Sequence, residues 1–395
     1  MPLPASLPTA DPHEVGLSAA ALQRMSDVLG SETERGCRPG AGLLGPGGAP
    51  MAWLAGLAPA PPVRGTPMAR DSLFRIYSMT KPIVSLAVMM LVEEGRLLLS
   101  DPVSRYLPEY AGQSVGVLRE GRLERVPVER DATVQDMLRH TSGLAYEFTG
   151  DSPVQRMYTE LRVGSRHKDN AEFSVQLAGL PLLHQPGTRW EYSRSTDTLG
   201  RLVEVISGRT LGAFLAERIF EPLGMVDTAF HVPAPQQHRL AEAFADDPDG
   251  AGPVRLLEVP EPPRFESGGG GLVSSAPDYA RFLQMLHQGG RLDGAQLIGR
   301  KTLEWMTADH LGGLPGDPAL LPPGHGFGLG FAVRLQAGLD TTPGSVGQYF
   351  WSGLAGTHFW VDPREEMYAL LMIQAPNQRE RYRTLFRNLV YAALD

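Results

Sequence analysis

The chain has 395 residues, which is enough for two or three domains and for a cleft between them. Hydrophobic residues make up 42% of it and charged residues 20%, a composition that is typical of folded globular proteins and excludes general disorder. The net charge of −8 and the single cysteine, Cys37, argue against a nucleic-acid-binding protein, an internal disulfide and a cysteine-based metal site.

The amino-terminal sequence MPLPASLPTADPHEVGLS has no basic segment followed by an apolar one, as a secretory signal would have. No run of 18 apolar residues occurs in the sequence, so no membrane-spanning helix is predicted. We therefore expect a cytoplasmic protein that does not contact a membrane.

Three elements are predicted in the first hundred residues. The stretch AAALQRMSDVLG repeats apolar residues at helical spacing and ends at a glycine, which predicts a helix. Two apolar runs around a Pro-Gly-Gly turn, in GAGLLGPGGAPMAWLAGLA, predict a β-hairpin. The run from Ile83 to Val92 is almost entirely apolar and too short to cross a membrane, so it predicts a helix that is buried on all sides.

The middle and the end of the chain differ in character. From about Asp101 to Ser207, helical patterns such as TVQDMLRHTSGL alternate with polar loops, so this region is predicted to be mainly helical. The proline-rich stretches 246–263 and 312–326 are predicted to be long loops that help to line a site. GTHFWVDPREEMYALLMIQ predicts two strands around an Asp-Pro turn. YRTLFRNLVYAAL predicts a helix whose apolar face contains Tyr382, Leu385, Phe386, Leu389, Val390, Ala393 and Leu394.

Together these elements predict an α/β (α+β) fold with two domains. Hairpins from both ends of the chain would form one sheet with helices packed on it, giving a discontinuous domain of residues 1–100 and 208–395. Residues 101–207 would form the mainly helical second domain. The active site is expected in the cleft between the two domains.

A serine and a lysine stand three residues apart at the predicted start of the buried helix, in Ser78-Met-Thr-Lys81. Helices tolerate proline only in their first turn, so Pro82 places the helix start near these residues. Free backbone N–H groups at a helix start favour developing negative charge, and residues three apart share a helical face. A lysine desolvated in an apolar pocket can therefore deprotonate Ser78 and make it a nucleophile.

The same residues also have a purely structural interpretation, because Ser78 could simply cap the helix and Lys81 could be a solvated residue of its first turn. The pattern S-x-x-K occurs often by chance. However, only three of the 36 basic residues are lysines, and an arginine, which cannot deprotonate, would serve equally well for surface charge. The choice of lysine here favours the catalytic interpretation.

Other hydrolytic and metal sites have little support in the sequence. The string G-x-S-x-G of a Ser-His-acid hydrolase occurs once, as Gly112-Gln-Ser-Val-Gly116, and no histidine or acidic partner is marked for it. Four histidines could be considered for catalysis, but none has a spacing that marks it, and we expect them to be structural: His140, His184, His325 and His358. No His, Asp and Glu cluster has metal-ligand spacing.

A serine nucleophile also needs a proton shuttle and an oxyanion hole. Tyr192 follows a Pro-Gly turn and precedes a helix, so it could project into a cleft as a phenol of lowered pKa. One oxyanion donor can be the N–H of Ser78. The second could come from YFWSGLAGTHFWV, where Ser352, Gly353 and Gly356 allow close approach, although this stretch could equally be an edge strand with a glycine bulge.

Taken in order, Ser78-Met-Thr-Lys81, Tyr192-Ser-Arg194 and Trp351-Ser-Gly353 resemble the three motifs of the serine β-lactamase and penicillin-binding-protein superfamily. Within it, the chain most resembles the family VIII carboxylesterases, which are similar to class C β-lactamases. The strings MLRHTSGL, EPLGMVDTAF and GGGGLVSSAPDYARFLQML support the resemblance, which spans nearly the whole chain.

The resemblance implies a β-lactamase-like antiparallel sheet flanked by helices, with no cofactor. It also implies that Ser78 is acylated, that Lys81 activates it and that Tyr192 acts as general base and acid. By the same resemblance, the backbone N–H groups of Ser78 and Leu354 form the oxyanion hole.

Two departures from the family pattern bear on the substrate. Arg194 stands where class C β-lactamases have an asparagine, and Trp351 stands where they have the lysine of Lys-Thr-Gly. An apolar plane would thus replace the cation that pairs with a substrate carboxylate, which favours neutral esters over β-lactams and D-Ala peptides. Arg194, Trp351, Ser352 and Gly353 are the expected pocket residues.

The leading hypothesis is a carboxylesterase that cleaves short-chain, small-molecule esters through an acyl-enzyme on Ser78. A β-lactamase or D,D-peptidase and an acyltransferase are the alternatives among enzymes. A non-catalytic module that is acylated once and stalls is the alternative of another class; it would show a burst of product without turnover. The sequence leaves the oligomeric state open.

Overall fold

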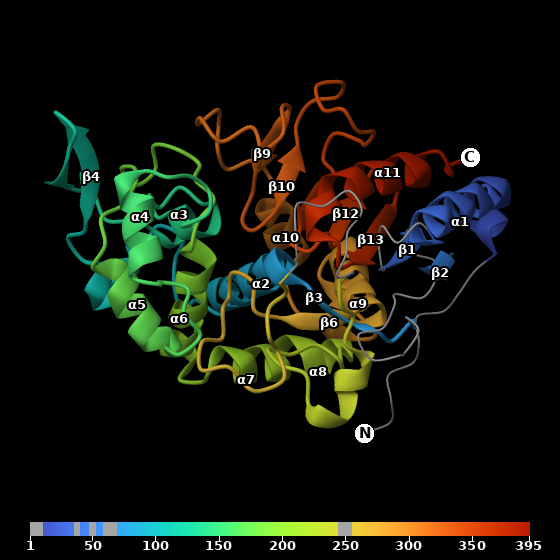
Figure 1. Ribbon diagram of the computed structural model, residues 1–395, viewed down its shortest axis with the longest axis horizontal. Helices are drawn as coiled ribbons and strands as arrows, with labels where there is room; N and C mark the ends of the chain where they lie inside the picture. Colours follow the sequence, from blue (N-terminus) through green and yellow to red (C-terminus); the bar gives the residue numbers. More distant parts are fainter. Residues whose placement is uncertain (1–10, 35–39, 47–52, 58–68, 244–254) are drawn as a thin grey trace.

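The computed structural model describes residues 11–34, 40–46, 53–57, 69–243 and 255–395 (Figure 1). Its centre is an antiparallel sheet in which strands from the start of the chain lie beside strands from its end. The first two strands pair as the predicted hairpin, although their connecting turn and Cys37 lie outside the described residues. The seven strands follow in the order β2 (Trp53–Leu57), β1 (Gly40–Pro46), β13 (Met367–Ile373), β12 (His358–Asp362), β11 (Tyr349–Ser352), β10 (Ala332–Arg334) and β9 (His325–Phe327).

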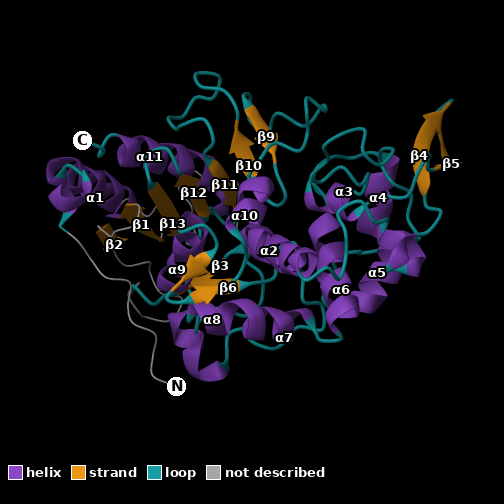
Figure 2. Ribbon diagram, turned by 180° about the vertical axis from the view of Figure 1, so that it is seen from behind, coloured by secondary structure: helices purple, strands orange, loops and turns teal. Residues whose placement is uncertain are grey.

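The interior strand β13 is apolar throughout, which suits a sheet covered by helices on both faces (Figures 1 and 2). Alternate side chains of a strand point to opposite faces. Ala369 and Leu371 pack with α1 (Ala19–Glu34) and α11 (Arg379–Tyr391). Tyr368 and Leu370 belong instead to the larger core on the opposite face, which the next two helices help to form.

Two helices fill the larger core between the sheet and the rest of the molecule. α2 (Thr80–Glu93) is buried at every position from Thr80 to Leu91, as predicted for the apolar run. α9 (Ala276–His287) begins at the cap residue Ser275 and packs against β13 and β1. In Figure 2, α2 extends from the sheet toward the helical region, so it links the two parts of the molecule.

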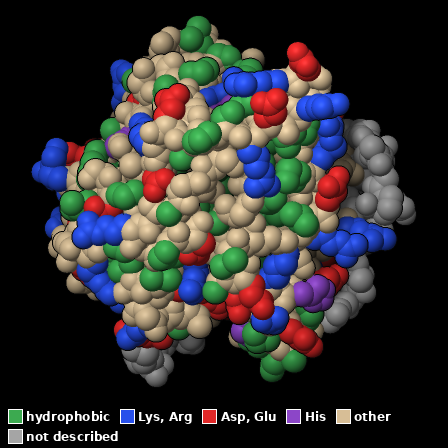
Figure 3. Space-filling view, turned by 90° about the vertical axis from the view of Figure 1, so that its left-hand side faces the viewer, with side chains coloured by type: hydrophobic (Ala, Val, Ile, Leu, Met, Phe, Trp, Pro, Cys, Tyr) green, Lys and Arg blue, Asp and Glu red, His purple; other side chains and the backbone are tan. Residues whose placement is uncertain are grey.

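The middle of the chain is mainly helical, as predicted. α3 (Val134–Leu138), α4 (Pro153–Glu160) and α5 (Asn170–Ala178) each begin with a reciprocal capping box, in which cap and third-residue side chains bond each other's backbone N–H. α6 (Ser195–Ser207) ends at Gly208, whose positive φ of 73° suits a glycine, and it packs against α2. Acidic and basic side chains are interspersed over this part of the surface (Figure 3).

Several short elements complete the fold. A hairpin that the sequence analysis did not predict projects from the helical region, where its exposed strands carry many charged residues (Figure 1). The remaining elements are β3 (Leu73–Arg75) paired with β6 (Val273–Ser275), β4 (Ser114–Arg119) with β5 (Arg122–Pro127), β7 (Arg291–Leu292) with β8 (Ala295–Gln296), and helices α7 (Leu211–Leu215), α8 (Glu221–Leu223) and α10 (Arg300–Met306).

The predicted α/β fold, an antiparallel sheet flanked by helices with a mainly helical second part, is confirmed. The first helix continues four residues beyond Gly30, and α11 begins three residues before the predicted stretch. Of the proline-rich stretch 246–263, residues 246–254 lie outside the described residues. The division into domains at residues 101 and 207 stays a prediction.

Candidate active site

Ser78 lies at the junction between β3 and α2. A single 3₁₀ turn, Tyr77–Met79, connects the two elements, and Pro82 stands in the first turn of the helix as predicted. Tyr77 has a left-handed φ of 43°, which is unfavourable for a tyrosine, and its hydroxyl accepts a hydrogen bond of 2.8 Å from the Leu257 N–H. This fixed, strained turn directs Ser78 into a cavity.

The Lys81 amine is buried beside Ser78. Its Nζ lies 3.2 Å from Ser78 Oγ, 3.0 Å from the Tyr146 hydroxyl and 2.7 Å from the Gly269 carbonyl, and the residue is 1% exposed. Burial lowers the pKa of Lys81 to about 7, and the charge of Asp197 opposes this shift. A substantial fraction of the amine is therefore neutral near neutral pH, and it can accept a proton from Ser78.

Tyr192 lies beside both Ser78 and Lys81. Its ring centroid is 4.4 Å from Lys81 Nζ, and Trp351 Nε1 lies 3.4 Å from its hydroxyl. Burial raises the pKa of Tyr192 above its ordinary value, although a hydrogen bond with Ser78 opposes the shift. The expectation that the pKa of Tyr192 is lowered is therefore wrong, because a phenolate would lose its solvation at this buried position. Tyr192 is a neutral phenol.

A second tyrosine, Tyr146, completes the surroundings of the amine and was not predicted. Besides its hydroxyl contact with Lys81, its ring stacks on Phe148 at 4.6 Å between centroids. Burial strongly raises the pKa of Tyr146, so it too is a neutral phenol. The available sequence signal is its position just after HTSGL, in a loop that follows a glycine as Tyr192 does.

Arg194 is not a free cation in the pocket. Its guanidinium forms ion pairs with Glu147 and Asp197 and lies over the Tyr146 ring, 4.9 Å from the centroid. Asp197 is buried and accepts hydrogen bonds from Ser267 Oγ (2.5 Å) and the Gly269 N–H (2.9 Å). The charge of Asp197 raises the pKa of Lys81, and the charge of Arg194 lowers it.

The third motif brings the end of β11 against the backbone that precedes Ser78. Gly353 makes this approach possible, because a Cβ on it would lie 2.4 Å from the Ile76 carbonyl oxygen. Trp351 is buried against Tyr192 and Phe327, at 5.3 and 5.2 Å between centroids. Leu354 lines the site with Ser78, and no acceptor among the described residues meets its backbone N–H. That N–H is therefore free to bond an oxyanion, and its role in the oxyanion hole stays a prediction.

Two cavities share Ser78 and Leu354. The larger has a volume of about 620 Å³ and the smaller about 220 Å³. Tyr192 and residues 350–354 line the larger cavity together with part of the proline-rich loop 312–326, which agrees with the predicted role of that loop. The smaller cavity is lined by Tyr146, Arg194 and Leu257, among others.

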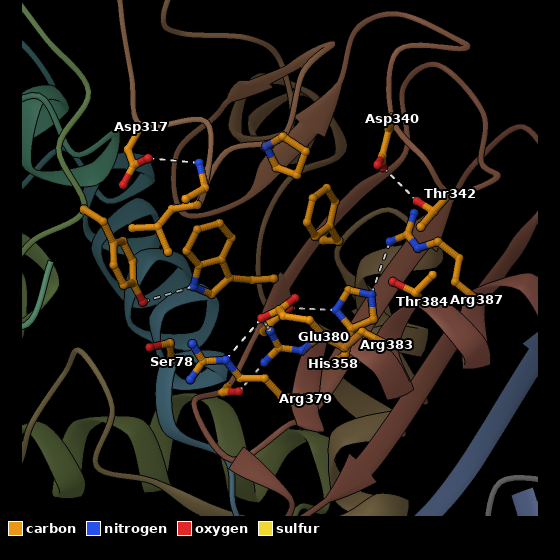
Figure 4. Close-up of a pocket in the computed structure, with 18 of the residues that line it drawn as sticks. Ser78, Asp317, Asp340, Thr342, His358, Arg379, Glu380, Arg383, Thr384 and Arg387 are labelled. Atoms are coloured by element: carbon orange, nitrogen blue, oxygen red, sulfur yellow. Dashed lines mark hydrogen bonds and ion pairs between the residues drawn. The ribbon is translucent and has the colours of Figure 1, made fainter. Parts of the chain in front are cut away.

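The larger cavity is also lined by three cations that the sequence analysis did not single out. Arg379, Arg383 and Arg387 stand four residues apart on α11 and line the larger cavity, which Ser78 also lines (Figure 4). Glu380 pairs with the first two, at 3.1 Å from Arg379 and 2.8 Å from Arg383. The spacing is visible in the sequence, but the packing of α11 beside β11 is what brings these arginines to the site.

Three of the four considered histidines have structural partners. His140 bonds Ser193 within an aromatic cluster, His184 faces Glu191, and His325 bonds the carbonyls of two prolines. His358 is different, because it lines the larger cavity next to Ser352.

Metal-ligand clusters and membrane-spanning helices are both absent from the described ranges. Nowhere in them do three His, Cys, Asp or Glu side chains gather as metal ligands would. Over the same residues, every helix is too short or too polar to cross a bilayer.

Comparisons with known proteins identify the family of this chain. A family model described as Beta-lactamase matches residues 27–393. An uncharacterized protein of Mycobacterium tuberculosis (strain CDC 1551 / Oshkosh) is 38% identical over 324 residues, which span 78% of this chain and 79% of that protein. Esterase EstB of Burkholderia gladioli is 33% identical over 334 residues, again 78% and 79% of the two chains.

The solved structure of EstCE1, described as a hydrolase with promiscuous acyltransferase activity, has the same fold, with a TM-score of 0.78 at 24% identity. The match covers 94% of this chain and 99% of EstCE1. The predicted β-lactamase-like fold and the predicted resemblance are thus confirmed. This chain belongs to the beta-lactamase family of serine hydrolases.

Proposed function

We propose that this protein is a carboxylesterase that cleaves short-chain acyl esters through an acyl-enzyme on Ser78. The observation that carries the proposal is the buried Lys81 amine, 3.2 Å from Ser78 Oγ and with a pKa lowered to about 7. A neutral amine at this distance is a competent general base for a serine nucleophile.

In the proposed reaction, neutral Lys81 takes the Ser78 proton while Oγ attacks the ester carbonyl. The N–H groups of Ser78 and Leu354 stabilise the resulting oxyanion. As the intermediate collapses, the Tyr192 phenol donates its proton to the departing alcohol and takes the proton held by Lys81 in its place, which leaves the acyl group on Ser78. Water then attacks the acyl-enzyme with the same groups in reverse order, releasing the carboxylic acid.

Three observations support an ester over a β-lactam as substrate. Trp351 presents an indole beside Tyr192, where the family pattern places a lysine. The charge of Arg194 is already paired with Glu147 and Asp197. The name of the relative EstB is that of an esterase. In a β-lactamase, the α11 arginines could instead pair with the carboxylate of the substrate. The test therefore compares an ester with a β-lactam.

The test measures kcat/KM for p-nitrophenyl butyrate and for nitrocefin with the same enzyme. We expect a strong preference for the ester, and mass spectrometry should find the transient acyl group on the Ser78 peptide. Ser78→Ala should abolish turnover while leaving the thermal unfolding midpoint nearly unchanged. A preference for nitrocefin would make the protein a β-lactamase, and activity retained by Ser78→Ala would mean that another group is the nucleophile.

The presence of two cavities beside Ser78 favours a second candidate function, acyl transfer to an alcohol. One cavity could hold the acyl chain while the other holds an acceptor alcohol in place of water. Reaction with p-nitrophenyl butyrate at increasing concentrations of 1-butanol would distinguish acyl transfer from hydrolysis. An acyltransferase would form butyl butyrate in proportion to the alcohol, whereas a dedicated esterase would form butyric acid only.

A further inference from the structure

A chain of three hydrogen-bonding side chains runs from α11 to the wall of the larger cavity. Arg387 lies 3.2 Å from His358 Nε2, and His358 Nδ1 lies 2.8 Å from Ser352 Oγ. Figure 4 shows His358 between Arg387 and the part of the cavity that contains Ser78. All three residues line the cavity, while Arg387 and His358 are each 4% exposed.

The direction of these hydrogen bonds follows from the donors available. A guanidinium can only donate, so His358 Nε2 must accept from Arg387. A neutral imidazole with an accepting Nε2 carries its proton on Nδ1, so His358 donates to Ser352 Oγ. Burial and the charges of Arg387 and Arg383 lower the pKa of His358 far below its ordinary value, which keeps the ring neutral.

Arg387 is itself held firmly in place. Its guanidinium donates to Gln348 and lies over the rings of Trp360 and Phe350, at 4.7 and 5.3 Å from their centroids. The Ser352 hydroxyl has no side-chain or backbone hydrogen-bond partner other than His358 among the described residues. Because Ser352 Oγ already accepts a hydrogen bond, its own hydrogen is left free for a molecule in the cavity.

We propose that Arg387 and His358 are positioning residues that hold the Ser352 hydroxyl as a hydrogen-bond donor to the substrate. The inference rests on the proposed esterase function and narrows the substrate class: the ester carries a second acceptor oxygen, besides those of the scissile group, that receives this hydrogen bond. A site built to donate discriminates against an analogue that lacks the acceptor, because the hydroxyl is then left unpaired.

The test uses isosteric ester pairs that differ by one oxygen. For the acyl side, p-nitrophenyl methoxyacetate is compared with p-nitrophenyl butyrate; for the alcohol side, 2-methoxyethyl butyrate is compared with butyl butyrate. We expect Ser352→Ala to lower kcat/KM for the methoxy member of one pair about tenfold more than for its carbon analogue, mainly through KM. Ser352→Thr, which keeps a hydroxyl, should restore the preference.

In the wild-type background, Arg387→Met should produce the same loss of preference for the methoxy ester as Ser352→Ala. In the Ser352→Ala background it should cause no further loss, because both substitutions remove the same hydrogen-bond donor, the Ser352 hydroxyl. If Arg387 had only a structural role, Arg387→Met would lower kcat/KM further in the Ser352→Ala background. Equal losses by Ser352→Ala on both members of both pairs would overturn the proposal.

The histidine tautomer provides a readout that does not depend on activity. In ¹⁵N-histidine-labelled protein, the signal that is missing from His358→Gln identifies His358, and we expect it to show Nδ1–H in the wild type. An Nε2–H tautomer would overturn the proposal even in an active esterase. If none of the esters were hydrolysed, the proposed function would fail, while the tautomer would still decide the direction of the hydrogen bonds.

Discussion

Lys81 is the residue on which the proposed chemistry depends, because its amine must be neutral to accept the Ser78 proton. Its pKa is lowered to about 7 by burial. Deprotonation increases with pH, so kcat/KM for p-nitrophenyl butyrate should rise with pH through a midpoint near 7. Lys81→Arg keeps the charge but cannot deprotonate, and it should lower kcat/KM by about 10² to 10⁴.

The neighbouring charges provide a matched control for this pH profile. Asp197 raises the pKa of Lys81, so Asp197→Asn should move the rising limb to lower pH. Arg194 lowers that pKa, so Arg194→Gln should move the limb to higher pH. Opposite shifts would identify an electrostatic effect on the lysine. A limb that stays in place in both variants, or a profile unchanged in Lys81→Arg, would mean that another group titrates.

At the scale of elements, the site depends on how closely the end of β11 approaches the chain before Ser78. In Gly353→Ala, the new Cβ would lie 2.4 Å from the Ile76 carbonyl oxygen and 2.2 Å from Thr357 Oγ1. The turn must shift away, and it takes the Leu354 N–H with it. We expect kcat to fall by up to about a hundredfold with a smaller change in KM, because an oxyanion donor acts mainly in the transition state.

Gly30→Ala is the matched control for this substitution. Gly30 lies in α1, and no heavy atom lies within 4 Å of the position a Cβ would take. The change should leave kcat unaltered and stabilise the helix by at most about 1 kcal/mol. A Gly353→Ala enzyme with full kcat would show that the Leu354 N–H does not contribute to the oxyanion hole.

At the scale of the whole molecule, the sequence predicted best what depends on short spacings. The i, i+3 separation of Ser78 and Lys81 and the apolar run of α2 are local patterns, and the structure has both as predicted. The contacts of Lys81 with Tyr146 and Asp197, and the arrival of the α11 arginines at the cavity, depend on long-range packing that no local pattern encodes. The direction of the Tyr192 pKa shift was missed for the same reason, since it follows from complete burial.

The packing of the whole molecule also bears on the predicted division into two domains. One hydrophobic core contains both Leu202 of α6, in the helical region, and Leu370 of β13, in the sheet, and α2 lies between them. Parts that share a core should unfold together. We therefore expect a single thermal transition, with coincident near- and far-ultraviolet circular dichroism.

Two buried leucines test this expectation from opposite ends of the core. Leu202→Ala and Leu370→Ala each truncate a side chain that is at most 1% exposed. Each substitution should lower the free energy of unfolding by about 2 to 5 kcal/mol. If the core is one cooperative unit, either substitution lowers the midpoint of the whole transition. If residues 101–207 fold as an independent domain, the wild type shows two transitions and Leu202→Ala moves only one of them. In that case the cleft that contains Ser78 would lie between two separately stable bodies.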